Sequence, residues 1–314
     1  MKHIDADQFN ASLDHAGAIE ALRDALRSGY DPRTDATRIP APLSRGQFLF
    51  MPSEIGKYAG VKILTVTPDN PAEDNPLIQG SCLLLDSHTH ATLALLDGVA
   101  LTNLRTPAVS LAGVADVLAR RFPDGVEMTV VGGGIQGSLH VDAALAVLPV
   151  RKATVLVRSA GRGESFLAHC ADLGVEAAEA VLGSEAASAA LRASGLVVTA
   201  TPAGEPVVAD SDVADDAVVV AMGSHDPGKR ELPAALLGRS TVLVESEHTA
   251  RAEAGDVVMA IADGTFTWDD VLTLREVVQA GGEQVPDDRP FVFKTTGMSW
   301  EDLVVASAVY EKNL

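Results

Sequence analysis

Apolar residues recur along the chain with two different spacings, which predict where strands and helices form. The first third is a mixed α/β region with one helix at 16–28, followed by a proline-containing loop at 31–42. A long helix is predicted over 99–120, with Pro107 near its first turn, where a missing N–H costs least. The predicted strands of this region are 47–51, 60–66, 81–86 and 91–96.

From residue 127 onward, strands and helices alternate. The strand-like runs are short, continuous and β-branched, as is typical of strands buried on both faces of a parallel sheet. Alanine-rich helical stretches such as 138–148 and 184–194 separate them, so we predict a Rossmann-type doubly wound fold. A final helix is predicted over 299–311, with Ser299 as its cap and acidic residues in its first turn. The six predicted strands are 127–131, 153–157, 175–178, 196–200, 217–222 and 241–245.

The composition limits the classes of partner. The chain has 314 residues, enough for two domains at about 150 residues each. Its net charge of −19 disfavours binding to nucleic acid or to anionic membranes. The N-terminus lacks the pattern of a secretory signal, and Cys82 and Cys170 form neither a disulfide framework nor a metal-ligand spacing. We therefore expect a cytoplasmic protein with no membrane span and no metal.

A glycine loop follows the predicted strand at 127–131 and precedes a helix, reading GGGIQG. In that context Gly132 permits a tight turn, Gly134 admits a pyrophosphate, and Gly137 allows close helix–strand packing. The helix N-terminus supplies N–H donors for the phosphates. We predict that this loop binds a dinucleotide, and the alternative is a glycine-rich turn in a flavodoxin-like domain without nucleotide. The predicted contacts are Gly132, Gly134, Ile135, Gln136 and Gly137.

The end of the next strand indicates which dinucleotide is bound. NAD enzymes normally carry an acidic residue there, which binds the ribose hydroxyls. This chain instead has Arg158, Ser159 and Arg162, side chains that suit a 2′-phosphate. The sequence therefore predicts NADP(H), with NAD(H) as a possible cofactor; alternatively, the two arginines are only solvated.

Three cations upstream of the glycine loop are candidates for binding a substrate. Lys62 lies in the apolar run VKILTV, Arg105 lies in the opening turns of an apolar helix, and Arg38 precedes both. Burying an unpaired charge costs several kcal/mol, so these cations need an anionic partner. In so acidic a protein, we expect that partner to be a substrate carboxylate.

An ordered set of motifs resembles the ornithine cyclodeaminase/mu-crystallin family over nearly the whole length. The set begins with Arg38 and contains motifs spread from residue 48 to residue 297. The motifs are FLFMP at 48–52, GVK at 60–62, LLLD at 83–86, LDG at 96–98, LTNLRTPA at 101–108, VVGGGIQG at 130–137, TATP at 199–202, GSHDPGKREL at 223–232, EAGD at 253–256 and FKTTG at 293–297.

This resemblance implies a Rossmann domain at 119–294. It also implies a discontinuous α+β domain for dimerisation and substrate binding, made of 1–118 and 295–314. Arg38, Lys62 and Arg105 match positions that hold the substrate carboxylate, and Gln79 matches a position beside the substrate. The resemblance also places three residues along the nicotinamide: Thr201, Gly223 and Ser224.

One departure bears on the substrate. Ornithine cyclodeaminases have an aspartate two residues after the glycine of the GSHDP segment, whereas this chain has His225 there and Asp226 one residue later. We therefore expect reduction of the C=N bond of a cyclic imino acid, as in pyrroline- or piperideine-2-carboxylate reductases, with Lys62, His225 or Asp226 as catalytic candidates.

Three alternatives remain open. One is ornithine cyclodeaminase activity, the second is an alanine-type amino acid dehydrogenase, and the third is a mu-crystallin-like ligand-binding protein without catalysis. The expected partners are a small amino or imino acid and, from the resemblance, a second copy of the chain.

Overall fold

A computed structural model describes residues 1–73 and 75–314, which divide into two compact units. Unit 1 comprises Met1–Ala108 and Gly297–Leu314, and unit 2 comprises Val109–Thr296. The predicted boundaries are 118/119 and 294/295, whereas these units divide at 108/109 and 296/297. The first difference falls inside one continuous helix, α3 (Gly98–Arg121), which contributes residues to both units.

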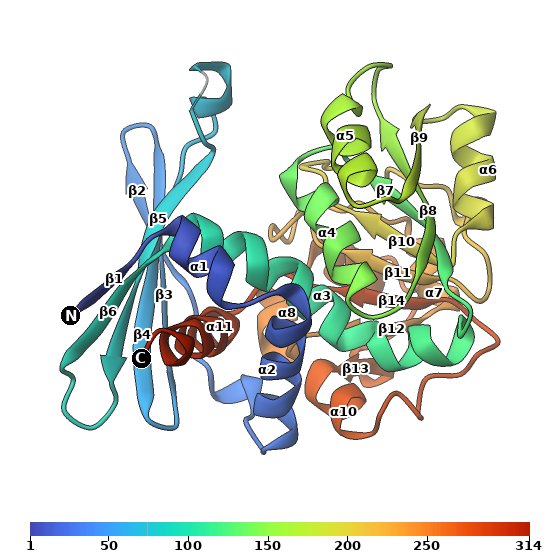
Figure 1. Cartoon of the computed structure of the whole chain (residues 1–314). Helices are drawn as coiled ribbons and strands as arrows, with labels where there is room; N and C mark the ends of the chain where they lie inside the picture. The colour runs from blue at the N-terminus through green and yellow to red at the C-terminus, as the bar shows by residue number, and fades with distance from the viewer. Residues whose placement is uncertain (74) are drawn as a thin grey trace. The chain divides into compact units, whose positions relative to one another are not determined.

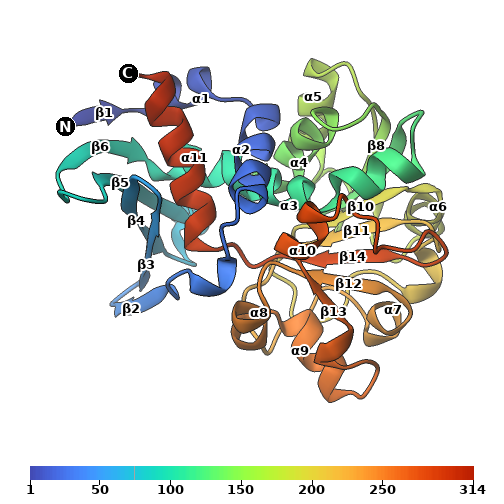
Figure 2. The same ribbon diagram turned by 90° about the horizontal axis from the view of Figure 1, so that it is seen from below.

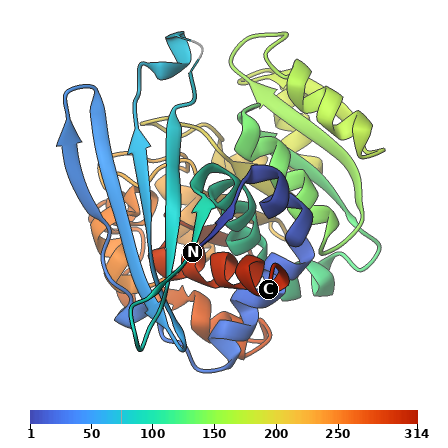
Figure 3. The same ribbon diagram turned by 60° about the vertical axis from the view of Figure 1, so that its left-hand side comes forward.

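Unit 1 is built on a six-stranded sheet in the order β1-β6-β5-β4-β3-β2. Strands β2 to β6 form an antiparallel meander, and β1 pairs with β6 in parallel. The C-terminal helix α11 packs against β3, β4 and β5, and α2 packs against α11 (Figure 2). The two chain termini lie near one another in this unit (Figure 3). The elements of unit 1 besides α3 are β1 (Lys2–Ile4), α1 (Ala6–Ser12), α2 (His15–Arg27), β2 (Ile39–Leu43), β3 (Gly46–Ile55), β4 (Tyr58–Val66), β5 (Ile78–Asp86), β6 (Thr92–Asp97) and α11 (Ser299–Lys312).

The alternation of side chains explains why α11 can cover this sheet. Along β3, Leu49 and Met51 are buried, while their neighbours Phe48 and Phe50 are only partly buried. The same period of two continues in β4 and β5. One face of the sheet therefore forms a core with α11, and the other face stays partly exposed.

Unit 2 contains an eight-stranded parallel sheet in the order β13-β12-β14-β11-β10-β7-β8-β9 (Figure 1). Its central strands are fully buried, as in Val218–Ala221, which explains their continuous β-branched sequence. The strand order reverses between β10 and β7, and ligands of such sheets bind at the carboxyl ends of the strands at this point. The elements of unit 2 are β7 (Val126–Val131), α4 (Ile135–Leu145), β8 (Val150–Val157), α5 (Glu164–Asp172), β9 (Glu176–Val181), α6 (Glu185–Ala193), β10 (Leu196–Thr199), β11 (Val218–Ala221), α7 (Ala234–Arg239), β12 (Thr241–Val244), α8 (Glu247–Glu253), α9 (Gly255–Ala262), β13 (Val271–Thr273), α10 (Leu274–Gln279) and β14 (Phe291–Lys294).

Several predicted elements need correction. The sequence pattern missed β1, β2, β13 and β14 together with α1, α8, α9 and α10. Strand β2 lies across the end of the predicted loop 31–42, because antiparallel pairing with β3 accommodates its two prolines at the edge of the sheet. Pro107 lies well inside α3 rather than near its first turn. The cap of α11 is Met298, and Ser299 is its first helical residue.

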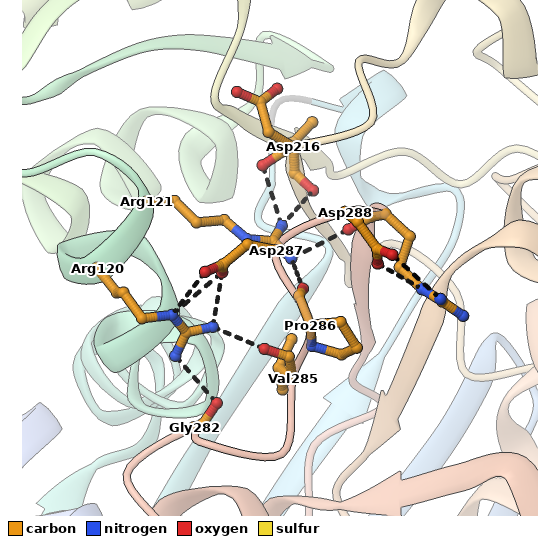
Figure 4. Close-up of polar contacts among 10 residues, drawn as sticks. Arg120, Arg121, Asp216, Gly282, Val285, Pro286, Asp287 and Asp288 are labelled. Carbon is orange, nitrogen blue, oxygen red and sulfur yellow. Dashed lines mark hydrogen bonds and ion pairs between the residues drawn. The ribbon is translucent and has the colours of Figure 1, made fainter.

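The C-terminal end of α3 is fixed within unit 2 by two arginines (Figure 4). Arg120 donates to the carbonyl oxygens of Gly282 at 3.1 Å and Val285 at 2.7 Å, and it pairs with Asp287 at 2.9 Å. Arg121 contacts the same carboxylate at 3.2 Å, and these hydrogen bonds lower the pKa of Asp287. The pairs satisfy loop carbonyls and place cations at a helix C-terminus, where the helix dipole favours them.

Within the described part of the chain, no helix is both long enough and apolar enough to cross a membrane.

Candidate functional site

The glycine loop connects β7 to α4 with the geometry of a phosphate-binding turn. Gly132 has a φ of +110°, and a Cβ there would lie 2.6 Å from the Ala200 oxygen. A Cβ at Gly137 would lie 2.3 Å from the Gly132 oxygen, so close packing of helix and strand requires glycine. Gly134 caps α4 with no side-chain hydrogen bond, and a Cβ there would meet nothing within 4 Å. The loop therefore offers backbone N–H groups and open space, which fits a dinucleotide pyrophosphate.

Two other predicted cofactor residues in this loop differ in exposure. Ile135, the first residue of α4, is 61% exposed although it is apolar. Gln136 is partly buried, and its carbonyl oxygen contacts Nδ1 of the buried His140 at 2.7 Å. The exposed isoleucine stands beside the helix N-terminus, where a bound ligand would cover it.

The loop after β8 carries Arg158, Ser159 and Arg162, and all three are exposed. A carboxylate that the sequence interpretation missed holds this loop in place. Glu179 of β9 accepts hydrogen bonds from the backbone N–H of Gly161 at 2.7 Å and of Gly163 at 2.6 Å. No local signal marks Glu179, because its role comes from the pairing of β8 with β9.

Thr201 and Gly223 follow two neighbouring strands, β10 and β11, at the carboxyl edge of the sheet. Both loops bind one buried carboxylate, that of Glu231, which is 0% exposed. Ser224 is also buried, and its carbonyl oxygen accepts a hydrogen bond from Lys294 Nζ at 2.7 Å. Glu231 and Lys294 lie in motifs that carried the family resemblance, but the sequence assigned them no role.

His225 and Asp226 lie on an exposed turn after Ser224. Asp226 accepts a hydrogen bond from the Gly228 backbone N–H at 2.9 Å, and Lys229 Nζ lies 3.5 Å from its carboxylate. These contacts, the backbone one first, lower the pKa of Asp226. The carboxyl group is thus ionised at neutral pH and bound by its own turn.

In unit 1, Lys62 of β4 and Arg105 of α3 meet at two acidic residues of α11. Lys62 Nζ lies 2.5 Å from Asp302 Oδ1, and both side chains are almost fully buried. Arg105 contacts Glu301 at 3.1 Å and Asp302 at 3.0 Å. The sequence placed both cations correctly as buried but expected only a ligand carboxylate as partner. The chain itself supplies two carboxylates, and we call these four residues the unit 1 ion cluster.

The sequence interpretation missed Glu301 and Asp302 because acids in the first turn of a helix are ordinary. A usable signal was present: they are the only two charges before Glu311 in the otherwise apolar run of 299–311. Asp302 Oδ2 is buried and has no hydrogen-bond partner among the described residues. Asp35, which is distant in sequence, accepts a hydrogen bond from the Trp300 backbone N–H in the first turn of the same helix at 2.9 Å.

The protonation of Lys62 is set by its surroundings. Burial lowers the pKa of Lys62 to about 8, and the nearby Arg105 charge adds to that effect while Asp302 opposes it. The ammonium is therefore mostly protonated at neutral pH and titrates just above it.

Arg38 and Gln79 lie differently with respect to this cluster. Arg38 donates a hydrogen bond to the carbonyl oxygen of Gly297. Gly297 also lies against Arg105: a Cβ at Gly297 would lie 2.4 Å from Arg105 Nη1, so this close approach favours glycine. Arg38 and Arg105 thus flank one glycine. Gln79 is exposed, and the alternation along β5 puts it on the opposite face of the sheet from Cys82, the residue that pairs with Lys62.

Comparison with known proteins identifies the family. The family model described as the ornithine cyclodeaminase/mu-crystallin family matches residues 5–314. The chain belongs to this family. The predicted family and fold class are therefore confirmed.

Individual members of the family are similar over most of their length. A Delta(1)-pyrroline-2-carboxylate reductase from Bacillus cereus is 32% identical over 284 residues, which is 88% of this chain and 84% of that protein. An alanine dehydrogenase from Archaeoglobus fulgidus is 28% identical, over 86% of this chain and 81% of that protein. The structure of Thermococcus litoralis Delta(1)-pyrroline-2-carboxylate reductase in complex with NADH and L-proline superposes with a TM-score of 0.90. It is 26% identical and covers 99% of this chain and 97% of that one.

Proposed function

We propose that this family member is a nicotinamide-dependent oxidoreductase that reduces the C=N bond of a cyclic imino acid carrying a carboxylate beside the imine carbon. The observation that carries the proposal is the presence in one chain of a buried ion cluster and a phosphate-binding glycine loop. Unit 1 buries the unit 1 ion cluster, which together with Arg38 has three cations and two carboxylates. Unit 2 presents a glycine loop whose helix N-terminus is capped by no side chain. The similarity to pyrroline-2-carboxylate reductases supports this substrate class.

The charge count of unit 1 favours an anionic substrate. Arg38, Lys62 and Arg105 are cations, whereas Glu301 and Asp302 supply two carboxylates. One positive charge is left over, which matches a single substrate carboxylate. Glu301 and Asp302 orient the cations and offset two of the three positive charges, and a positioned guanidinium binds a carboxylate through two parallel hydrogen bonds.

The reaction needs a hydride at the imine carbon and a proton at the nitrogen. A bound nicotinamide supplies the hydride. Lys62 holds a proton at neutral pH and gives it up near pH 8, which suits a proton donor. His225 is the second candidate if the imine arrives unprotonated, because it is exposed and imidazole is the commonest general acid in enzymes. Asp226, already ionised in its turn, is a weaker donor.

We propose NADP(H) as the preferred cofactor, with NAD(H) as a possible alternative cofactor. Arg158, Ser159 and Arg162 stand exposed after β8, where an NAD enzyme would place a carboxylate. Glu179 of the neighbouring strand β9 is engaged with two backbone N–H groups of this loop. Arg158→Ala should therefore weaken NADPH binding by about tenfold and leave NADH binding unchanged.

A second activity deserves a test because it uses the same cluster. Oxidation of an open-chain amino acid such as alanine also requires a bound α-carboxylate, and the similarity to an alanine dehydrogenase favours including it. Ornithine cyclisation is less favoured, because His225 replaces the aspartate expected from the family pattern.

We also propose a homodimer formed through the partly exposed face of the unit 1 sheet. Helix α11 covers the other face, and this one carries a contiguous set of aliphatic and aromatic side chains. A Leu83→Glu substitution on the central strand β5 should give a monomer by light scattering. The apolar residues of this face are Phe48, Phe50, Val61, Ile63, Leu83, Leu85, Leu93 and Leu95.

The experiment that tests the function is cofactor oxidation followed by absorbance, with NADPH and NADH in parallel. The panel contains pyrroline- and piperideine-2-carboxylate, and keto acids with amines. Rapid NADPH oxidation with a cyclic imino acid is the expected result. Turnover only with pyruvate and ammonia would show an amino acid dehydrogenase instead. No cofactor oxidation with any compound of the panel, together with ammonia release from ornithine, would show a cyclodeaminase instead.

A further inference from the structure

Two loops at the carboxyl edge of the unit 2 sheet are fastened to each other by one buried carboxylate. Glu231 Oε1 accepts hydrogen bonds from both the backbone N–H and the hydroxyl of Thr201, each at 2.8 Å. Its other oxygen, Oε2, accepts the backbone N–H of Gly223 at 2.8 Å. One side chain therefore fixes the ends of β10 and β11 relative to each other.

The loops are in direct contact where Glu231 joins them. A Cβ at Gly223 would lie 2.1 Å from the Thr201 oxygen and 2.6 Å from Glu231 Oε1. Only glycine permits this approach, and a shift of either loop would break a hydrogen bond to the carboxylate. The position of Thr201 and the position of Gly223 are thus coupled.

Glu231 is itself held by a second layer of charges. The carboxylate of Asp256 accepts the backbone N–H of Glu231 at 2.7 Å and of Leu232 at 2.8 Å. Lys294 Nζ lies 3.1 Å from Asp256 and donates to the Ser224 carbonyl oxygen at 2.7 Å. We call Glu231, Asp256 and Lys294 the unit 2 ion cluster. It ties the start of α9 and the end of β14 to the same two loops.

Glu231 is placed to position other groups rather than to react. The side chain is fully buried, and both carboxylate oxygens already accept hydrogen bonds. Burial raises the pKa of Glu231, and Lys294 opposes that shift. A carboxylate surrounded by N–H and O–H donors serves as an acceptor, and its ionised form is the one that the loops require.

We infer that Glu231 is a positioning residue for hydride transfer: by fixing Thr201 against Gly223, it sets the wall against which the nicotinamide ring lies. The inference rests on the proposed function: the two loops follow β10 and β11 at the carboxyl edge of the sheet, beside the point where the strand order reverses and a dinucleotide binds. The family resemblance implies that Thr201, Gly223 and Ser224 line the nicotinamide there. It predicts that loss of the carboxylate alters ring placement more than cofactor affinity, because the glycine loop and the Arg158 loop bind the rest of the dinucleotide.

The test is Glu231→Gln, which keeps the size of the side chain but turns one acceptor into a donor facing an N–H group. A misplaced reacting group can cost on the order of 100-fold in rate, so we expect kcat with pyrroline-2-carboxylate to fall by 10- to 100-fold. The dissociation constant of NADPH should change by less than roughly threefold. The kinetic isotope effect from NADPH deuterated at C4 should rise, because hydride transfer becomes rate-limiting.

A matched control is Asp270→Asn. Asp270 accepts hydrogen bonds from the backbone N–H of Thr267 at 2.9 Å and from its hydroxyl at 2.8 Å. Glu231 accepts the same pair of hydrogen bonds from Thr201. It lies before the edge strand β13, at the opposite end of the strands from the two loops. This variant should keep wild-type kcat and isotope effect. Glu231→Asp retains the charge, should recover part of kcat, and replaces the Gln variant if that variant does not fold.

Fluorescence of NADPH bound without substrate separates the two proposals, since it reports the surroundings of the nicotinamide ring independently of turnover. Altered nicotinamide emission in Glu231→Gln at unchanged affinity supports the inference even if no imino acid is reduced by the wild type, an outcome that would overturn only the proposed function. Wild-type emission, kcat and isotope effect in a folded Glu231→Gln protein would overturn the inference and leave the function intact.

Discussion

The ion cluster of unit 1 and that of unit 2 are both buried, but their carboxylates bind different groups. In unit 2, Glu231 and Asp256 accept mainly backbone N–H groups, and a single cation, Lys294, accompanies them. In unit 1, Glu301 and Asp302 pair with the cationic side chains of Lys62 and Arg105.

The difference teaches what each cluster is suited to do. Carboxylates that accept mainly backbone N–H groups fix loops, and the unit 2 cluster has no excess cation to bind an anionic ligand. Carboxylates that hold cationic side chains pre-orient donors, and with Arg38 nearby the unit 1 cluster has an excess of positive charge. This contrast supports the proposals that the unit 1 cluster binds the substrate carboxylate and that the unit 2 cluster fixes the loops.

The largest expected effect is that of Arg105→Ala on catalysis. The substitution removes a donor to the substrate carboxylate, and truncating one partner of a buried charge pair costs about 2–5 kcal/mol, so kcat/KM should fall by roughly 100- to 1000-fold. Steady-state kinetics on the cyclic imino acid measure it. Arg120→Ala, on the same helix but paired with the exposed Asp287, is the control and should retain activity. Unchanged kcat and KM in Arg105→Ala would show that the substrate binds elsewhere.

Lys294→Met should have a large effect on the free energy of unfolding and a smaller effect on kcat/KM. It leaves Asp256 buried without its cation, and breaking a buried ion pair in this way costs about 3–5 kcal/mol of the free energy of unfolding. Denaturant unfolding measures the loss. Adding Asp256→Asn should recover part of it, because the amide oxygen can still accept the N–H groups of Glu231 and Leu232. A double variant no more stable than Lys294→Met would contradict the assignment of a loop-fixing role to this charge pair.

The same contrast explains how far the sequence could predict the molecule. The glycine loop was predictable because strand, turn and helix are contiguous, and Lys62 stood out because a charge interrupted an apolar run. The partners of the cations were not predictable, since Asp302 lies 240 residues from Lys62 and looked like an ordinary helix start. Glu179 and Glu231 bind loops that follow neighbouring strands of the sheet, and these contacts are not local in sequence. The missed strands β1 and β13 have three residues each, too short to show a period.

Catalysis should also depend on pH, and this dependence bears on Lys62 directly. If protonated Lys62 holds the substrate or supplies the proton, kcat/KM should fall as the pH rises through about 8, the lowered pKa of this buried ammonium. Above that midpoint the loss approaches tenfold per pH unit. The measurement is kcat/KM between about pH 6.5 and 10.

Stability should change in the opposite direction over the same range, which separates titration from unfolding. The pKa of Lys62 is lowered on folding from 10.5 to about 8, so between these values the unfolded chain binds more protons than the folded one. The contribution of this group to the free energy of unfolding therefore rises with pH in that window. Lys62→Arg keeps the charge throughout and should remove the alkaline decline. A decline that persists in Lys62→Arg would belong to the imine substrate or to another group, and would remove Lys62 from the proton transfer.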